Sequence, residues 1–140
     1  METKIIYFVH GTTTDNEKHV SSGWKNVELS QKGVEQSFAL KEKVPMEKID
    51  IVFCSDLKRA IDSAEILFGG EKTIYNDKRL RECNYGDLDG KDKSLIIYEN
   101  HIDDPFPNGE SLKNVEILIS VYFFFLEYLN IPITSVLKFA

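Results

Sequence analysis

Short apolar runs bounded by polar turns alternate along the chain with longer segments in which apolar residues recur at helical spacing. The first run, Ile5 to Val9, has no polar break and ends at His10. Such a run is typical of a strand buried on both faces, as in a parallel sheet. A second buried strand is expected over Ile49 to Cys54, a short third over Lys72 to Tyr75, and a last one over Ile133 to Ala140.

Two helices are expected between the first three strands. Ser30 is suited to cap the first helix, which should end near Val44. The second helix opens at Ser55 and Asp56, either of which could act as its cap, and Gly69 should end it.

A third helix should begin after Ser111 and run to about Leu129. From Val115 onward its residues are apolar on nearly every side, which indicates burial on more than one side. The segment is too short and too charged to span a membrane. A weak helix is also expected over residues 91–100. Strands and helices thus alternate along one domain of 140 residues, which predicts an α/β fold with a largely parallel sheet.

The charge balance limits the possible partners. The chain carries 17 Lys and Arg against 23 Asp and Glu, a net charge of −6, so we expect no nucleic-acid surface. Any anion site must then be a local positive pocket. The two cysteines, Cys54 and Cys83, lack metal-ligand spacing, and Ile5 to Val9 is too short for a signal peptide. A cytoplasmic location without membrane contact is therefore expected.

The turn after the first strand is the first candidate site. In open α/β sheets ligands bind beyond the carboxyl ends of the strands, where His10 lies. Gly11 would let the backbone approach a ligand, and the turn from Thr12 to Asn16 offers hydroxyl and amide donors for an oxyanion. A buried core histidine followed by an ordinary polar turn fits the same residues about equally well.

Two charged residues are further candidates. Arg59 falls in the first turn of the second helix, where backbone N–H groups already favour an anion, and arginine suits bidentate phosphate contacts. Glu82, in a charged loop, could serve as general acid or base if it is held in a pocket. Taken singly, a surface arginine and a solvated loop carboxylate are the commoner interpretations.

Together these motifs resemble the histidine phosphatase superfamily, which includes the phosphoglycerate mutases. That family opens with a strand, Arg-His-Gly, a variable residue, Thr, two further residues and Asn, and the chain matches this pattern from His10 to Asn16. Residues 54–60 resemble its second arginine motif, residues 79–87 its acid/base motif, and residues 106–111 its substrate-side loop. The resemblance covers nearly the whole chain and implies a three-layer sandwich, with a mostly parallel sheet flanked by helices.

The resemblance also implies a mechanism. His10 would attack phosphorus to form a phosphohistidine, and Glu82 would protonate the leaving alcohol and then activate water. The residues implied to bind phosphate are Arg59, Gly11, Thr13 and Asn16. No metal or cofactor is implied, and the ligand would be a small phosphorylated substrate or phosphate.

The chain departs from the family pattern at two points. Val9 stands where the family has an arginine, so Arg81, or else Arg79 or Lys58, would have to substitute. The family also places a second histidine after a late strand, which the segment ending at Ala140 resembles. The C-terminal part of the family fold is therefore expected to be missing.

Three functions follow from this comparison. The first is a phosphomonoester phosphatase, impaired by the two departures. The second is a non-catalytic protein that binds phosphorylated ligands or has a regulatory role. A phosphoglycerate mutase is less expected, because no long insertion is present to shape a cap for a bisphosphate. We also expect the apolar region from Val115 to Ala140 to mediate self-association as a symmetric dimer.

Overall fold

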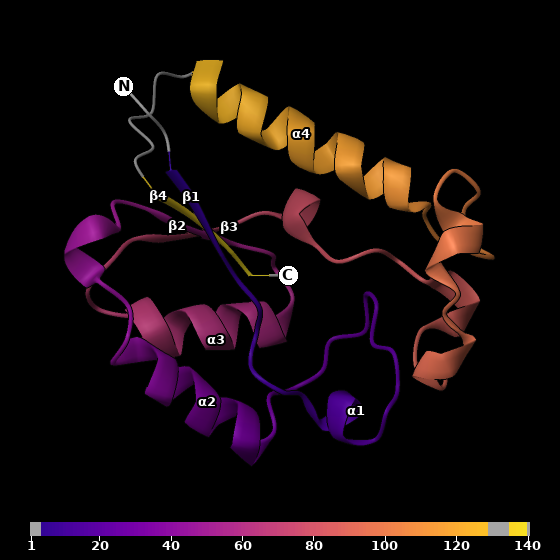
Figure 1. Ribbon diagram of the computed structural model, residues 1–140, viewed down its shortest axis with the longest axis horizontal. Helices are drawn as coiled ribbons and strands as arrows, with labels where there is room; N and C mark the ends of the chain where they lie inside the picture. The colour runs from indigo at the N-terminus through magenta and orange to yellow at the C-terminus, as the bar shows by residue number, and fades with distance from the viewer. Residues whose placement is uncertain (1–3, 129–134, 140) are drawn as a thin grey trace.

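A computed structural model describes residues 4–128 and 135–139 (Figure 1). The strands are β1 (Lys4–Phe8), β2 (Val52–Cys54), β3 (Ile74–Asn76) and β4 (Ser135–Phe139). They form one sheet in the order β1-β4-β2-β3, in which all neighbouring pairs are parallel. The α-helices are α1 (Thr14–Glu17), α2 (Gln31–Lys41), α3 (Lys58–Phe68) and α4 (Leu112–Tyr128).

Helices cover both faces of the sheet, so the expected α/β sandwich with a parallel sheet is confirmed. Helices α2 and α3 lie on one face and α4 crosses the other (Figure 1). Successive strand residues point to opposite faces. Val52 and Cys54 of β2 accordingly belong to the cluster shared with α3, while Phe53 between them contacts Tyr122 of α4. This central strand is buried on both faces, as its sequence predicts.

Strand β1 is not buried on both faces, and that prediction is wrong. Ile6 and Phe8 pack against the cluster on the α3 side, but Ile5 and Tyr7 are 52% and 55% exposed. The exposure of these two side chains follows from the tertiary arrangement of the sheet and α4. Strand β1 comes first in the sheet order, while the buried side chains of α4 pack over Phe53 of β2. The periodicity of a single strand does not reveal which neighbour a distant helix will cover.

Local capping explains where two helices begin. The Ser30 hydroxyl accepts a hydrogen bond from the backbone N–H of Gly33, so its prediction as a cap is confirmed. Ser111 is confirmed in the same way, because its hydroxyl accepts from the backbone N–H of Asn114. Such caps satisfy amides at the helix N-terminus that have no partner within the helix.

The start of α3 differs from the prediction, because neither Ser55 nor Asp56 caps it. The backbone N–H of Lys58 instead donates to Oδ1 of Asn26, 2.7 Å away in a distant loop. The Asp56 carboxylate is taken by Arg81. The cap of α3 therefore comes from a residue that no local motif indicates.

The segment between β3 and α4 contains the short 3₁₀ turns η2 (Lys78–Leu80), η3 (Gly86–Leu88), η4 (Lys93–Leu95) and η5 (Tyr98–His101). The weak helix expected over residues 91–100 is therefore wrong. The carbonyl oxygen of Lys91 accepts from the backbone N–H of Ser21, and Val20 forms a β-bridge with Asp92. These contacts attach the segment to the loop that follows α1 and close one side of a cavity.

Candidate active site

A cavity of about 410 Å³ lies beyond the carboxyl end of β1, where the sequence predicts a site. Segments far apart in the sequence line it. They are Val9, His10, Thr12 and Asn16 after β1; His19, Val20, Ser21 and Ser22 in the next loop; Arg59 in α3; and Glu82, Tyr85, Lys93 and Tyr98 after β3. The fold thus brings His10, Arg59 and Glu82 together.

The hydrogen bonding of His10 determines its tautomer. Nδ1 lies 2.6 Å from the carbonyl oxygen of Gly11. A carbonyl can only accept, so Nδ1 carries the hydrogen and Nε2 keeps a lone pair. Burial lowers the pKa of His10, and Arg59 lowers it further, against the Gly11 hydrogen bond and Glu82. A neutral imidazole with an unprotonated Nε2 is the form that can act as a nucleophile.

This environment predicts a titration that can be measured. Because burial disfavours the charged form, the imidazole of His10 should gain its proton only below the ordinary histidine pKa of 6.5. The measurement is an NMR titration of the imidazole C–H signals, assigned by comparison with His10→Asn. A midpoint above 6.5 would contradict the buried, neutral imidazole.

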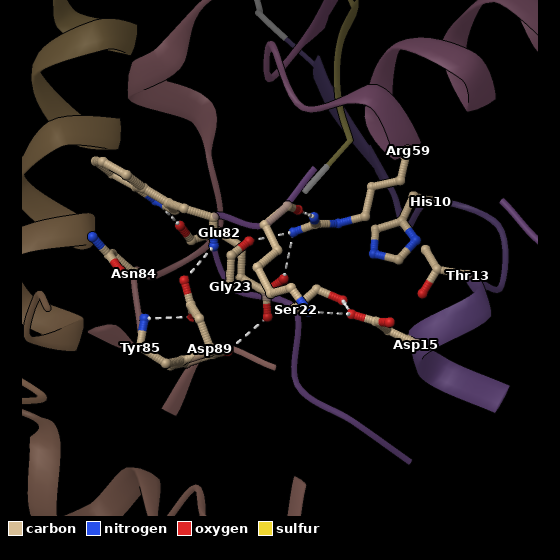
Figure 2. Close-up of polar contacts among 12 residues, drawn as sticks. His10, Thr13, Asp15, Ser22, Gly23, Arg59, Glu82, Asn84, Tyr85 and Asp89 are labelled. Carbon is tan, nitrogen blue, oxygen red and sulfur yellow. Dashed lines mark hydrogen bonds and ion pairs between the residues drawn. The ribbon is translucent and has the colours of Figure 1, made fainter. Parts of the chain in front are cut away.

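Arg59 is a buried cation rather than a surface residue. Its side chain is 1% exposed. Nη1 donates to the carbonyl oxygen of Lys25 at 3.1 Å, and Nη2 donates to that of Gly23 at 2.9 Å and to Oε2 of Glu82 at 3.0 Å (Figure 2). The two carbonyls fix the guanidinium at the cavity, so its positive charge is placed before any ligand arrives.

Both carboxylate oxygens of Glu82 are engaged. Tyr85 donates its hydroxyl hydrogen to Oε1 at 2.6 Å, while Arg59 holds Oε2. The indole N–H of Trp24 donates to the backbone oxygen of Glu82 at 2.9 Å. Burial and the charge of Glu82 raise the pKa of Tyr85, which keeps the phenol protonated and able to donate. Glu82 is therefore an oriented carboxylate that is still 34% exposed.

Asp89 connects the two loops that position these groups. Its Oδ1 accepts from the backbone N–H of Tyr85 at 3.2 Å, and its Oδ2 accepts from that of Trp24 at 3.0 Å (Figure 2). Gly23 must be glycine here, because its φ is +49° and a Cβ would lie 1.7 Å from Oδ1 of Asp89. The carboxylate thus fixes the turn that presents the Gly23 carbonyl to Arg59.

Gly11 and Thr13 do not line this cavity, and their prediction as phosphate ligands is corrected. The backbone N–H of Gly11 donates to Oγ of Ser63, and a Cβ on Gly11 would lie 2.4 Å from the oxygen of Gly33. Gly11 therefore allows close contact with α2. Thr13 is fully buried and caps α1, accepting from the backbone N–H of Asn16. Asn16 itself does line the cavity.

The position of the family's first arginine is apolar. Val9 is 64% exposed and lines the cavity. Arg81 does not replace the arginine, because its guanidinium binds Asp56 and lies 4.8 Å from the ring of Trp24, outside the cavity. Arg79 and Lys58 likewise form ion pairs, with Asp77 and Asp62, away from the cavity lining.

Lys93 supplies a positive charge that the sequence interpretation missed. It is exposed and lines the cavity, as do His19 and Tyr98. The backbone N–H of Lys93 donates to the carbonyl oxygen of His19 at 2.9 Å. The only signal for its location is the pairing of two distant loops, which is a tertiary feature. In the described part of the chain, no three His, Cys, Asp or Glu side chains are grouped to hold a metal ion, and no helix is long and apolar enough to cross a membrane.

The fold is an α/β sandwich, and its cavity brings a histidine, an arginine and a glutamate together beyond the carboxyl end of β1. The chain matches the family model of the histidine phosphatase superfamily (branch 1) over residues 6–117 and belongs to that family.

Several known proteins are similar to this chain. Phosphoglycerate mutase 1 of Saccharomyces cerevisiae is 35% identical over 67% of the chain and 40% of that protein. A 2,3-bisphosphoglycerate-dependent phosphoglycerate mutase of Bradyrhizobium diazoefficiens is 30% identical over 81% of the chain and 62% of that protein. The chain therefore spans about half the length of these relatives.

A solved mycobacterial glucosyl-3-phosphoglycerate phosphatase, in complex with VO₃, superposes with a TM-score of 0.87 at 24% identity. The match covers 98% of this chain and 75% of that one. At this level of identity the likeness shows the fold.

Proposed function

We propose that this chain is a phosphomonoester phosphatase that acts through a phosphohistidine at His10. The observation that supports this best is a neutral imidazole, with Nε2 unprotonated, in the cavity that also holds Arg59 and Glu82. Nε2 attacks phosphorus as the bond from phosphorus to the alcohol oxygen breaks, and Glu82 gives that oxygen a proton. Glu82 then takes a proton from water, which attacks phosphorus and releases His10.

Hydrolysis of an activated aryl phosphate tests this proposal. We expect weak but measurable release of the phenol, unchanged by a chelator of divalent metal ions, because the proposed steps use only side chains of this chain. Membership in a family of phosphatases and mutases supports the reaction class. Binding of phosphate without any turnover would instead favour a non-catalytic protein that binds phosphorylated ligands.

We also infer a cytoplasmic location. Cys54 and Cys83 are free, buried thiols, which is usual in a compartment where disulfides are rare.

The second candidate is a protein that binds phosphorylated ligands without hydrolysing them. It is favoured by the exposed Val9 side chain at the position of the family's first arginine, and by Arg81 being bound to Asp56. A mutase is separated from both by one assay. Interconversion of 3- and 2-phosphoglycerate after addition of 2,3-bisphosphoglycerate would favour a mutase, in line with the names of the curated relatives.

Loss of the Arg59 charge should lower the rate about 100- to 1000-fold, the usual effect of removing one donor to a developing oxyanion. Arg59→Met preserves much of the bulk at this buried position. The matched control is Arg79→Met, because Arg79 is held by Asp77 and does not line the cavity. Equal rates for the Arg59→Met protein and the parent, with folding verified by circular dichroism, would exclude Arg59 from the reaction.

The dimer expected from the sequence remains a proposal. Four apolar side chains of α4 are exposed: Ile117, Leu118, Val121 and Phe124, the last at 71%. The side chains of Phe125 and of residues 127–140 lie outside the described part of the chain. We expect sedimentation to show a dimer at about 50 μM, which Phe124→Glu should dissociate and Glu116→Gln should not. A monomer at that concentration would contradict self-association through α4.

A further inference from the structure

In the structure the buried cation of the site is already paired with the proposed acid. Nη2 of Arg59 donates to Oε2 of Glu82 at 3.0 Å, and the guanidinium is held in place by the carbonyl oxygens of Gly23 and Lys25. Its Nε is buried and has no hydrogen-bond partner among the described residues. The carboxylate is the more exposed partner, because its side chain is 34% exposed and that of Arg59 is 1% exposed.

A phosphoryl dianion that enters this cavity meets the carboxylate already paired with Arg59. Two negative charges that share a partly buried site disfavour each other. The cations that line the cavity are Arg59 and Lys93. Glu82 also interacts electrostatically with His10 and Tyr7 from the β1 segment, and with Cys83, Tyr85 and Asp89 from its own loop. His19 and Tyr98 are the further titratable groups that line the cavity.

The two oxygens of Glu82 are not equivalent in this arrangement. Tyr85 holds Oε1 at 2.6 Å with a hydroxyl that stays protonated, so Oε1 can only continue to accept. The partner of Oε2 is Arg59, the group that an anion would attract. Removal of Arg59 from Oε2 would leave that oxygen free to carry a hydrogen.

We propose that an entering phosphoryl anion takes Arg59 from Oε2 of Glu82 and that this oxygen takes up a proton from solvent in the same step, while Tyr85 keeps Oε1. Tyr85 is thus a positioning residue for the acid. This inference rests on the proposed function for its ligand, a phosphoryl group, but it requires no turnover. Ligand binding then loads the proton that the leaving alcohol needs.

Calorimetry with inorganic sulfate tests the exchange, because sulfate is a dianion that does not titrate between pH 6 and 8. Titrations at pH 7 in buffers of different ionisation enthalpy should show uptake of about one proton per bound sulfate. Above neutrality the affinity of the parent should fall about tenfold per pH unit. Glu82→Gln should bind sulfate without proton uptake and with little dependence on pH.

Three outcomes would overturn the proposal. The first is proton uptake that persists in Glu82→Gln and disappears in His10→Asn, because the imidazole would then be the acceptor. The second is binding by the parent without any uptake. The third is an absence of sulfate binding to the parent, whether or not Glu82→Gln binds it, because the anion would then not displace the carboxylate.

The role of Tyr85 has its own readout. In Tyr85→Phe the carboxylate loses a donor, so the pH at which sulfate affinity begins to fall should move upward. The matched control is Tyr75→Phe, which removes a phenol hydroxyl on β3 outside the cavity and should leave the pH dependence unchanged. An unshifted profile in Tyr85→Phe would exclude Tyr85 as a positioning residue. If the protein passes these tests but hydrolyses no phosphate ester, the phosphatase proposal is wrong and the proposal of proton uptake at Glu82 still holds.

Discussion

Replacement of His10 by alanine should abolish hydrolysis of aryl phosphates, because it removes the only nitrogen in the proposed reaction that forms a bond to phosphorus. The carbonyl oxygen of Gly11 also holds the imidazole of His10 in the tautomer with Nε2 unprotonated, and an alanine side chain offers no such nitrogen. The measurement is the steady-state rate of phenol release by identically purified proteins.

His101→Ala is the matched control for this variant. His101 lies outside the cavity, where its ring stacks on Phe106 at 3.8 Å, so its loss should leave the rate close to that of the parent. A His10→Ala protein that hydrolyses the substrate as fast as the parent would assign the activity to a contaminant. The phospho-ligand-binding function would then be the better explanation.

Replacement of Glu82 by glutamine should slow hydrolysis by an amount that depends on the leaving group. General acid catalysis is worth about 100- to 10,000-fold when the leaving oxygen needs a proton. An alkyl phosphate should show a loss of that size, whereas an ester of an acidic phenol should lose much less. Rates for a series of esters with leaving groups of graded acidity measure this difference.

The glutamine variant also has a close control. Glu99 lies in the same region of the chain but does not line the cavity, so Glu99→Gln should hydrolyse every ester at the parental rate. Equal losses for good and poor leaving groups in Glu82→Gln would contradict a proton donor. They would point to a structural role in holding Arg59 through Oε2.

Local sequence patterns predicted the central strand, the Ser30 and Ser111 caps and the α/β order, because each depends on neighbouring residues. The burial of β1 was not predictable in this way, because it depends on where α4 crosses the sheet. The prediction of the α3 cap was wrong for a similar reason, because the cap comes from a distant part of the chain. Asn26, which accepts from the Lys58 amide, is 32 residues away along the chain.

In the candidate site, too, some features could be predicted from the sequence and others depend on tertiary contacts. Family resemblance placed His10, Arg59 and Glu82, and the structure brings them to one cavity. It did not reveal that the Thr13 hydroxyl is used to cap α1. Nor did it reveal that Lys93 reaches the cavity, because that position follows from the pairing of two loops far apart in the sequence.

The most direct test of the proposed function is to identify the phosphorylated residue during turnover. The protein is mixed with an aryl phosphate, quenched within the first turnovers at alkaline pH, where phosphohistidine survives, and digested for mass spectrometry. We predict one phosphoryl group on His10, lost on brief acid treatment and absent from His10→Asn. A phosphoryl group on another residue, or turnover without any phosphoryl group on His10, would contradict the phosphohistidine mechanism.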